Sequence, residues 1–166
     1  MGVASIFGIF TATYYWFPKM FGRHMSEGLG KVHFWITFVG VNAIFMPMHF
    51  LGMVGHPRRY PELSGFNFLA ELWPLHMFIT IAAFVTIAVQ FVFLFNFTWS
   101  LFKGRKAAMN PWSATTLEWE IPSPPPHDNF GDRQVVVHHG PYEYSVPGRE
   151  KDFVMQTEGK REGTEA

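Results

Sequence analysis

Three long stretches without a charged side chain constrain this chain more than any other feature of its sequence. Met1–Phe17, Val32–Gly55 and Leu72–Phe102 contain no Asp, Glu, Lys or Arg, and the third runs for 31 residues. A transmembrane helix needs about 20 consecutive apolar residues to cross a bilayer core of roughly 30 Å. The second and third stretches reach that length. The first begins already in apolar sequence and reads as a helix whose beginning is missing.

The third stretch is also too uniformly apolar for a helix of a soluble protein. A soluble surface helix shows a polar face about every 3.6 residues. Phe84–Phe97 interrupts its apolar run only with Thr86, Gln90 and Asn96. The sequence therefore predicts an all-α membrane protein with transmembrane helices at about residues 1–17, 31–55 and 72–102.

The basic residues give these helices a predicted orientation. One basic cluster lies between the first and second stretches, and another follows the third: Lys19, Arg23 and Lys31, then Lys103, Arg105 and Lys106. Basic flanks favour the cytoplasmic side. Three crossings place both clusters there and residues 56–71 on the outer side. We therefore divide the chain into a transmembrane region, residues 1–106, and a cytoplasmic tail, residues 107–166.

The predicted tail differs in composition from the helices. Ten of the 13 acidic residues follow Lys103. The run Pro122–Pro126 is proline-rich and favours polyproline II over helix. Gln134–His138 is compatible with a short strand, and the polar segment Lys151–Ala166 indicates partial disorder.

Composition and motifs argue against several functions for the isolated chain. Its formal net charge is zero, which gives no reason to expect nucleic-acid binding, and it has no cysteine for a thiolate metal site or nucleophile. No phosphate-binding loop, nucleophile elbow or HExxH motif is present. We therefore assign no catalytic residue to the chain.

The eight histidines raise the question of a metal site. His33 and His49 are 16 positions apart on one predicted helix, or roughly 24 Å, so they cannot bind one ion. A cluster of His49, His56 and His76 at the outer side is conceivable, but its spacing matches no metal motif. We favour structural hydrogen bonding for these histidines and assign no metal ligand.

Asn42 and His49 lie inside the second predicted membrane helix, and Gln90 and Asn96 lie inside the third. Polar side chains in hydrocarbon are costly and usually face protein or a cavity. Hydrogen bonds between helices are the favoured interpretation, and a proton route is the alternative.

One segment resembles a known family closely. Residues 31–60, KVHFWITFVGVNAIFMPMHFLGMVGHPRRY, resemble the penultimate helix and following loop of subunit I of haem–copper (cytochrome c) oxidases. YYWFPKMFGR at Tyr14–Arg23 resembles the end of the preceding helix in bacterial members, and LEWEIPSPPPHDNF at Leu117–Phe130 resembles the cytoplasmic tail. The resemblance identifies the chain with the last three helices of a twelve-helix core and its tail.

The resemblance implies a respiratory complex of the bacterial inner membrane that reduces dioxygen to water and pumps protons. Its expected cofactors are a low-spin haem and a haem–copper centre, ligated by residues outside this chain, so the isolated chain should bind no copper and be inactive. Its expected partners are the rest of subunit I, other oxidase subunits, the lipid bilayer, and cytochrome c or a similar electron donor. The alternative is a non-catalytic membrane scaffold or assembly protein derived from an oxidase subunit.

The resemblance also assigns a role to two residues. In the family, the arginine pair matching Arg58 and Arg59 interacts with haem propionates. Arginine suits this role because it is permanently charged and presents fixed donors to a carboxylate. A loop cap or a lipid-phosphate contact is the alternative.

Overall fold

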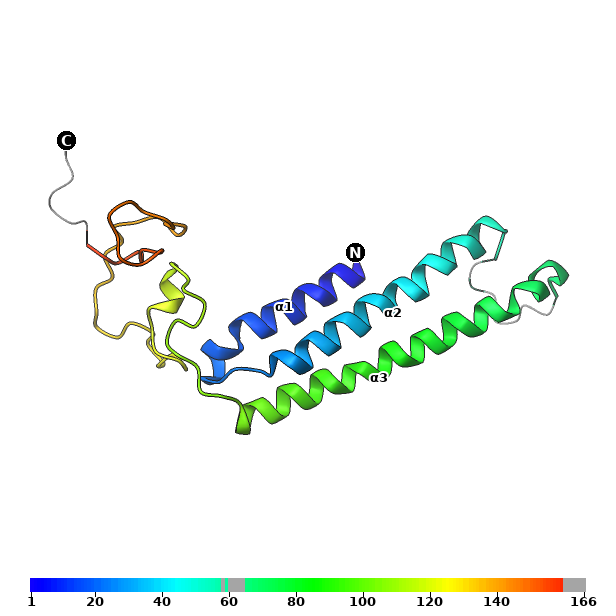
Figure 1. Ribbon diagram of the computed structural model, residues 1–166, viewed down its shortest axis with the longest axis horizontal. Coiled ribbons are helices and arrows are strands. Elements are labelled where there is room, and N and C mark those ends of the chain that lie inside the picture. The colour runs from blue at the N-terminus through cyan, green and yellow to red at the C-terminus, as the bar shows by residue number, and fades with distance from the viewer. Residues whose placement is uncertain (58, 60–64, 160–166) are drawn as a thin grey trace. The chain divides into compact units, whose positions relative to one another are not determined.

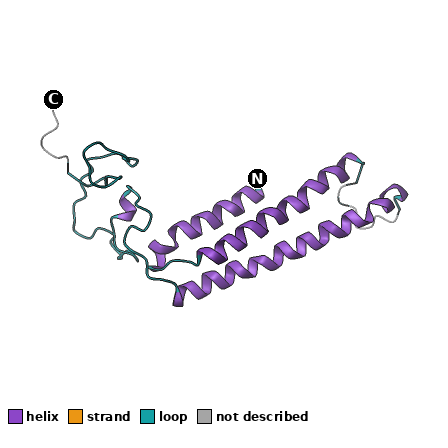
Figure 2. Cartoon of the chain, viewed as in Figure 1, coloured by secondary structure: helices purple, strands orange, loops and turns teal. Residues whose placement is uncertain are grey.

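The computed structural model describes residues 1–57, 59 and 65–159 (Figure 1). Arg58 therefore lies outside the described residues. The regular elements are helical, and Figure 2 draws no strand in the described part of the chain. This confirms the expected all-α class. The chain forms two compact units, Ser26–Trp99 and Met1–Met25 with Ser100–Ala166, which are described separately below.

Two long helices make up most of the first unit. α2 (Glu27–Met53) and α3 (Trp73–Lys103) run antiparallel side by side (Figure 1). A short 3₁₀ helix, η1 (Asn67–Leu72), leads directly into α3. By length and composition, α2 and the continuous helical segment Asn67–Lys103 can each cross a membrane. The second and third predicted helices are thus present, with boundaries shifted by a few residues.

The end of α2 is set by a glycine. Gly55 has φ 94°, a left-handed conformation that costs little without a Cβ. Its N–H donates to the carbonyl of Gly52, and the N–H of His56 donates to that of Leu51, at 3.1 Å in both cases. These two bonds form a Schellman motif, which satisfies carbonyls that the helix end would otherwise leave unpaired. The motif fixes the direction in which the chain leaves α2.

The other unit contains α1 (Gly2–Phe21) and the tail. α1 continues past Phe17 and through Pro18, and it ends at Gly22, whose φ is 65°. The N–H of Gly22 donates to the Pro18 carbonyl at 2.9 Å. α1 is not among the described helices that combine the length and apolar composition of a membrane span, in keeping with its threonines and Tyr14-Tyr15-Trp16. Its crossing of the membrane stays a prediction.

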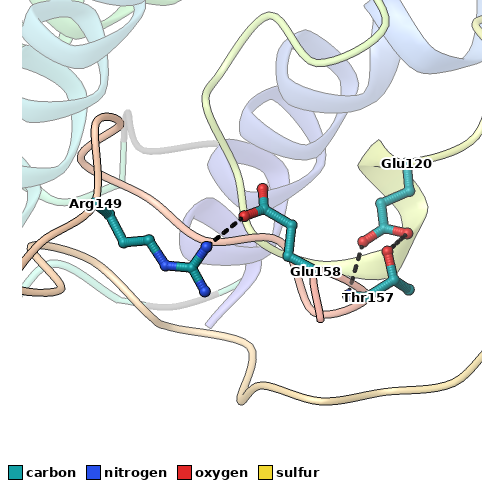
Figure 3. A network of polar contacts seen from close by, with 4 residues as sticks. All are labelled: Glu120, Arg149, Thr157 and Glu158. Atoms are coloured by element: carbon teal, nitrogen blue, oxygen red, sulfur yellow. Dashed lines mark hydrogen bonds and ion pairs between the residues drawn. The ribbon is translucent and has the colours of Figure 1, made fainter. Parts of the chain in front are cut away.

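The tail folds on itself with little regular structure. One short 3₁₀ helix, η2 (Leu117–Trp119), carries the fully buried Trp119. Glu120 accepts hydrogen bonds from the Thr157 hydroxyl at 2.6 Å and its N–H at 3.2 Å, and Arg149 lies 3.5 Å from Glu158 (Figure 3). The bonds of Glu120 tie residues around 120 to those around 157, and the Arg149–Glu158 pair ties residue 149 to the same segment.

The short strand predicted at Gln134–His138 does not form. The N–H groups of His138 and His139 both donate to the same carbonyl, that of Gln156, at 2.8 and 3.2 Å. Two consecutive donors directed at one acceptor do not make a β ladder, in which bonding directions alternate. The segment is compatible with a strand by sequence, but its backbone bonds in the structure do not form one.

Candidate functional site

A pocket of about 390 Å³ lies where α2 ends and α3 begins. Apolar side chains from both helices form one part of its lining, and polar side chains from the loop and α3 form the other. The lining residues are Met48, Leu51, Gly52, His56, Pro57, Arg59, His76 and Ile79. None of these described residues is acidic. The pocket therefore combines apolar walls with donors of hydrogen bonds and positive charge.

Two histidines meet in this pocket. The ring centroids of His56 and His76 are 5.0 Å apart, with planes tilted by 42°. The Schellman bond from His56 N–H to Leu51 holds the first ring at the end of α2, and α3 carries the second. Trp73 adds an aromatic neighbour, its ring centroid 6.5 Å from that of His76. Both imidazoles are half-buried.

His76 has a polar atom that the rest of the described chain does not satisfy. Its Nε2 is buried and has no hydrogen-bond partner among the described residues. Leaving such an atom unpaired costs about 1–3 kcal/mol. The pocket therefore holds a donor or acceptor whose partner lies outside the described chain.

Arg59 is the one member of the predicted arginine pair that the structure describes. It lines the pocket, is exposed, and has φ 62°, a left-handed value uncommon for a residue with a Cβ. A guanidinium beside two imidazoles favours an anion over a cation in the same space. The donor set thus suits a carboxylate or a phosphate.

The histidine cluster considered from the sequence forms only in part. His56 and His76 meet, but His49 is exposed and donates from Nδ1 to the carbonyl of Phe45 in its own helix at 2.7 Å. Among the described residues, no group of three His, Asp or Glu side chains could hold a metal ion. The structural interpretation of His49 is thus the one that its contact supports.

A second polar site lies between α2 and α3. The buried His33 donates from Nε2 to Oε1 of Gln90 at 3.0 Å. Gln90 donates in turn from Nε2 to the Thr37 hydroxyl at 3.2 Å and to the Thr86 carbonyl at 2.8 Å. This cluster, His33–Thr37–Gln90, is the predicted hydrogen bonding between helices. A proton route through it stays a hypothesis.

The other intramembrane polar residues behave differently from one another. Asn96 is fully buried and bonds through its side-chain amide to both backbone groups of Ser26, each at 3.0 Å. Asn42, in contrast, is exposed and donates to the Phe38 carbonyl within its own helix at 2.8 Å. Within the described chain, the printed side-chain bonds of Asn42 and His49 stay inside their own helix, so hydrogen bonding to another helix stays a prediction for both.

The sequence did not indicate the close approach of the two helices next to this cluster. A Cβ added to Gly40 of α2 would overlap the hydroxyl of Thr86 on α3. That hydroxyl donates to the Ala82 carbonyl at 2.7 Å, so it cannot rotate away without losing a bond. A small residue facing a hydroxyl residue is typical of packed membrane helices. A search for small residues on the His33 face of α2 would have found Gly40.

Lys19 was interpreted as a basic flank, but it is buried in the unit that contains α1. Only 5% of its surface is exposed, and its Nζ donates to the carbonyls of Ile121 at 2.6 Å and Met109 at 3.1 Å. The same Nζ lies 5.1 Å from the centre of the Trp119 ring, a cation–π contact. Lys19 follows the uncharged stretch Met1–Phe17, outside the predicted membrane span. Burial lowers its pKa from the ordinary value of 10.5, and the Glu118 carboxylate opposes that shift.

Comparison with known proteins decides the family. The model of the family described as cytochrome c and quinol oxidase polypeptide I matches residues 1–85, about half of the chain. The chain belongs to the cytochrome c and quinol oxidase polypeptide I family. It is 48% identical over 160 residues to the alternative cytochrome c oxidase subunit 1 of Bradyrhizobium diazoefficiens, covering 95% of this chain and 27% of the relative.

Further members of this family show the same partial coverage. The chain is 46% identical over 142 residues to cytochrome c oxidase subunit 1 of Synechocystis sp., covering 86% of this chain and 25% of that protein. It is 37% identical over 164 residues to cytochrome c oxidase subunit 1 of Bacillus sp., covering 97% of this chain and 24% of that protein. The chain thus spans about a quarter of the length of the curated relatives it matches.

Membership implies haem, and the pocket can be tested for its fit to that group. A haem presents carboxylates at its propionate edge and an apolar ring elsewhere. The pocket pairs the cationic Arg59 and the unpaired Nε2 of His76 with the apolar Met48, Leu51 and Ile79. The donor set therefore fits a propionate.

Proposed function

We propose that the chain supplies the last membrane helices and the tail of subunit I of a cytochrome c oxidase in a bacterial inner membrane. The complex would pass electrons from cytochrome c or a similar donor to dioxygen, reduce it to water and pump protons. The family match and the names of the relatives support this proposal. The two helices apolar enough to cross a membrane support it independently.

Within that complex, the chain's part is to bind haem propionates through Arg58 and Arg59. The observation that carries this role is the pocket at the ends of α2 and α3, where Arg59 lies beside two histidines and no described acidic residue. A bound haem would supply the electron-carrying iron. The arginines would hold its carboxylates, because an ionised carboxylate near a low-dielectric interior costs several kcal/mol unless a cation accompanies it.

The irons and the copper would be ligated by the rest of subunit I. Two of this chain's histidines already have partners: His33 bonds to Gln90, and His49 bonds to a carbonyl of its own helix. The purified chain alone should therefore neither consume dioxygen nor show the spectrum of a six-coordinate haem. A stoichiometric bis-histidine haem spectrum from that preparation would contradict this part of the proposal.

The arginine role can be tested by Arg59→Gln and Arg58→Gln in the assembled oxidase. Removing a positive charge near a haem should lower its midpoint potential, because the extra positive charge of the ferric state is then less disfavoured. One unit charge at roughly 8 Å and an effective dielectric of about 20 is worth about 2 kcal/mol, or about 90 mV for one electron. Solvent relaxation reduces this, so we expect a fall of tens of millivolts, on the order of half that value.

Spectroelectrochemical titration measures this fall. Arg133→Gln removes the same charge from an exposed position in the tail and serves as the matched control. Arg59→Lys keeps the charge but loses the planar fork of donors, so its effect should be small. If both Gln variants keep wild-type haem potentials, turnover and proton pumping, the arginines do not bind the propionates. Their role is then a loop cap or a lipid-phosphate contact.

A further inference from the structure

The unpaired Nε2 of His76 is the starting point of a second assignment in the same pocket. This atom is buried, lacks a hydrogen-bond partner among the described residues, and belongs to a ring that lines the pocket with Arg59. Buried polar atoms are nearly always paired in folded proteins. Its partner is therefore expected to be a group that enters the pocket from outside the described chain.

The surroundings of His76 determine the chemistry of that group. The pocket's described lining contains one permanent cation and two imidazoles, and no carboxylate. A metal ion would be repelled by the guanidinium of Arg59, and no third ligand joins His56 and His76 among the described residues. An oxyanion is attracted by the guanidinium and can accept a hydrogen bond from a neutral imidazole N–H.

We propose that His76 donates a hydrogen bond from Nε2 to the same carboxylate that Arg59 binds. This proposal rests on the proposed function, under which the carboxylate is a haem propionate. Nδ1 of His76 is then the unprotonated nitrogen. His56, 5.0 Å away between ring centroids, limits the orientations open to the His76 ring. His76 is thus a binding residue for the propionate, in addition to the arginine pair.

A neutral donor affects the haem in a predictable direction. The hydrogen bond withdraws electron density from the carboxylate and reduces its effective negative charge at the iron. Loss of the bond should lower the haem midpoint potential, with the same sign as Arg59→Gln and a smaller size. It should also shift the infrared carboxylate stretch of the propionate, which responds to hydrogen bonding and not to turnover.

The test uses variants of the whole oxidase. His76→Phe keeps an aromatic ring and removes the donor, whereas His76→Gln keeps an N–H donor. His49→Phe is the matched control, because His49 lies on α2 and its Nδ1 already bonds within that helix. We expect His76→Phe to lower the potential and shift the carboxylate band, His76→Gln to reverse most of both changes, and His49→Phe to leave both at wild-type values. His76→Leu replaces the Phe variant if the latter does not assemble.

The outcomes separate this inference from the proposed function. If Arg59→Gln moves the potential and the band while both donor-free His76 variants leave them unchanged, the His76 assignment is wrong and the arginine role stands. If neither the Arg59 variant nor the His76 variants change the haem potential or the carboxylate band, both proposals fail. If loss of His76 changes only the phospholipid content of the purified enzyme, the oxyanion is a lipid phosphate and the propionate assignment is overturned.

Discussion

Arg23 and Lys106 pair as an isolated antiparallel β-bridge, which joins the segment after α1 to the segment after α3. The N–H of His24 donates to the Arg105 carbonyl at 2.7 Å, and Arg23 donates from its guanidinium to the Gly104 carbonyl at 2.8 Å. The two basic clusters that the sequence places on one side of the membrane are therefore in contact. This contact agrees with the prediction that both clusters lie on one side of the membrane, and the cytoplasmic orientation itself stays a prediction.

That orientation predicts opposite labelling of two positions. The chain has no cysteine of its own, so Asn67→Cys and Ser113→Cys each introduce a single thiol. Both positions are exposed, at η1 and in the tail. With an impermeant maleimide on intact cells, Cys at 67 should label and Cys at 113 should label only after the membrane is opened. Labelling of both from outside would reject the orientation.

Removal of the Lys19 ammonium should loosen the tail. Lys19→Met keeps the apolar stem but leaves the carbonyls of Met109 and Ile121 without their charged donor. We expect a loss of about 2 kcal/mol from charge-assisted hydrogen bonds. This corresponds to a roughly 30-fold larger population of the opened tail. Limited trypsin digestion after Arg133 should accelerate accordingly, as followed by mass spectrometry.

Lys151→Met is the control for this experiment. Lys151 is an exposed lysine of the tail whose Nζ lies 5.8 Å from the Phe153 ring centre. It provides a similar cation–π contact without burial. Equal digestion rates at Arg133 in the two variants would mean that Lys19 does not hold the tail.

Gln90→Leu should weaken the pairing of α2 and α3. The substitution removes the side-chain bonds from Gln90 to His33 and Thr37. Hydrogen bonds between membrane helices are worth about 1 kcal/mol each, so a loss of about 1–2 kcal/mol is expected. Thr98→Val is the matched control, because Thr98 is exposed and bonds to carbonyls of its own helix. The measurement is the midpoint temperature of thermal inactivation of the detergent-solubilised oxidase carrying each variant. Equal midpoints for Gln90→Leu and Thr98→Val would mean that the bonds of Gln90 do not stabilise the helix pair.

Gly40→Ala should be destabilising, because its Cβ would overlap the Thr86 hydroxyl. Overpacking of this kind costs about 1–3 kcal/mol. Gly28→Ala in the same helix has space around it, with the Ser26 hydroxyl as its near neighbour at 4.0 Å, and should be neutral or slightly stabilising. Adding Thr86→Ala to Gly40→Ala should recover most of the loss. A double variant no more heat-stable than the single one would show that the contact is not the cause.

The sequence predicted α2 and α3 well because their signal is local. An uncharged apolar run of sufficient length leaves few alternatives for the backbone, since each peptide group must be paired inside a bilayer. Helix ends were less certain. α1 continues through Pro18, beyond the predicted end at about residue 17, and it ends at Gly22, which provides the left-handed residue.

The contacts of the candidate sites were harder to predict because they depend on which helix faces meet. Polarity correctly singled out Gln90, but the same criterion also selected Asn42, whose amide bonds to its own helix. The sequence around Lys19 does not show that this lysine is buried. Its hydrogen-bond partners are backbone carbonyls about 100 positions further along the chain. The arginine role, suggested by family resemblance, stays a proposal.

The Asn96–Ser26 contact has a consequence for how sequence change can proceed at these two positions. The side-chain amide of Asn96 bonds to the backbone N–H and carbonyl of Ser26, and the serine side chain takes part in neither bond. Position 26 can therefore take any residue except proline, which lacks the N–H that this contact uses, whereas position 96 needs one donor and one acceptor on a short planar group. Aspartate lacks the donor and leucine lacks both. The constraint is thus asymmetric: the side chain at position 26 can change during evolution, whereas the side chain at position 96 cannot change without losing the contact.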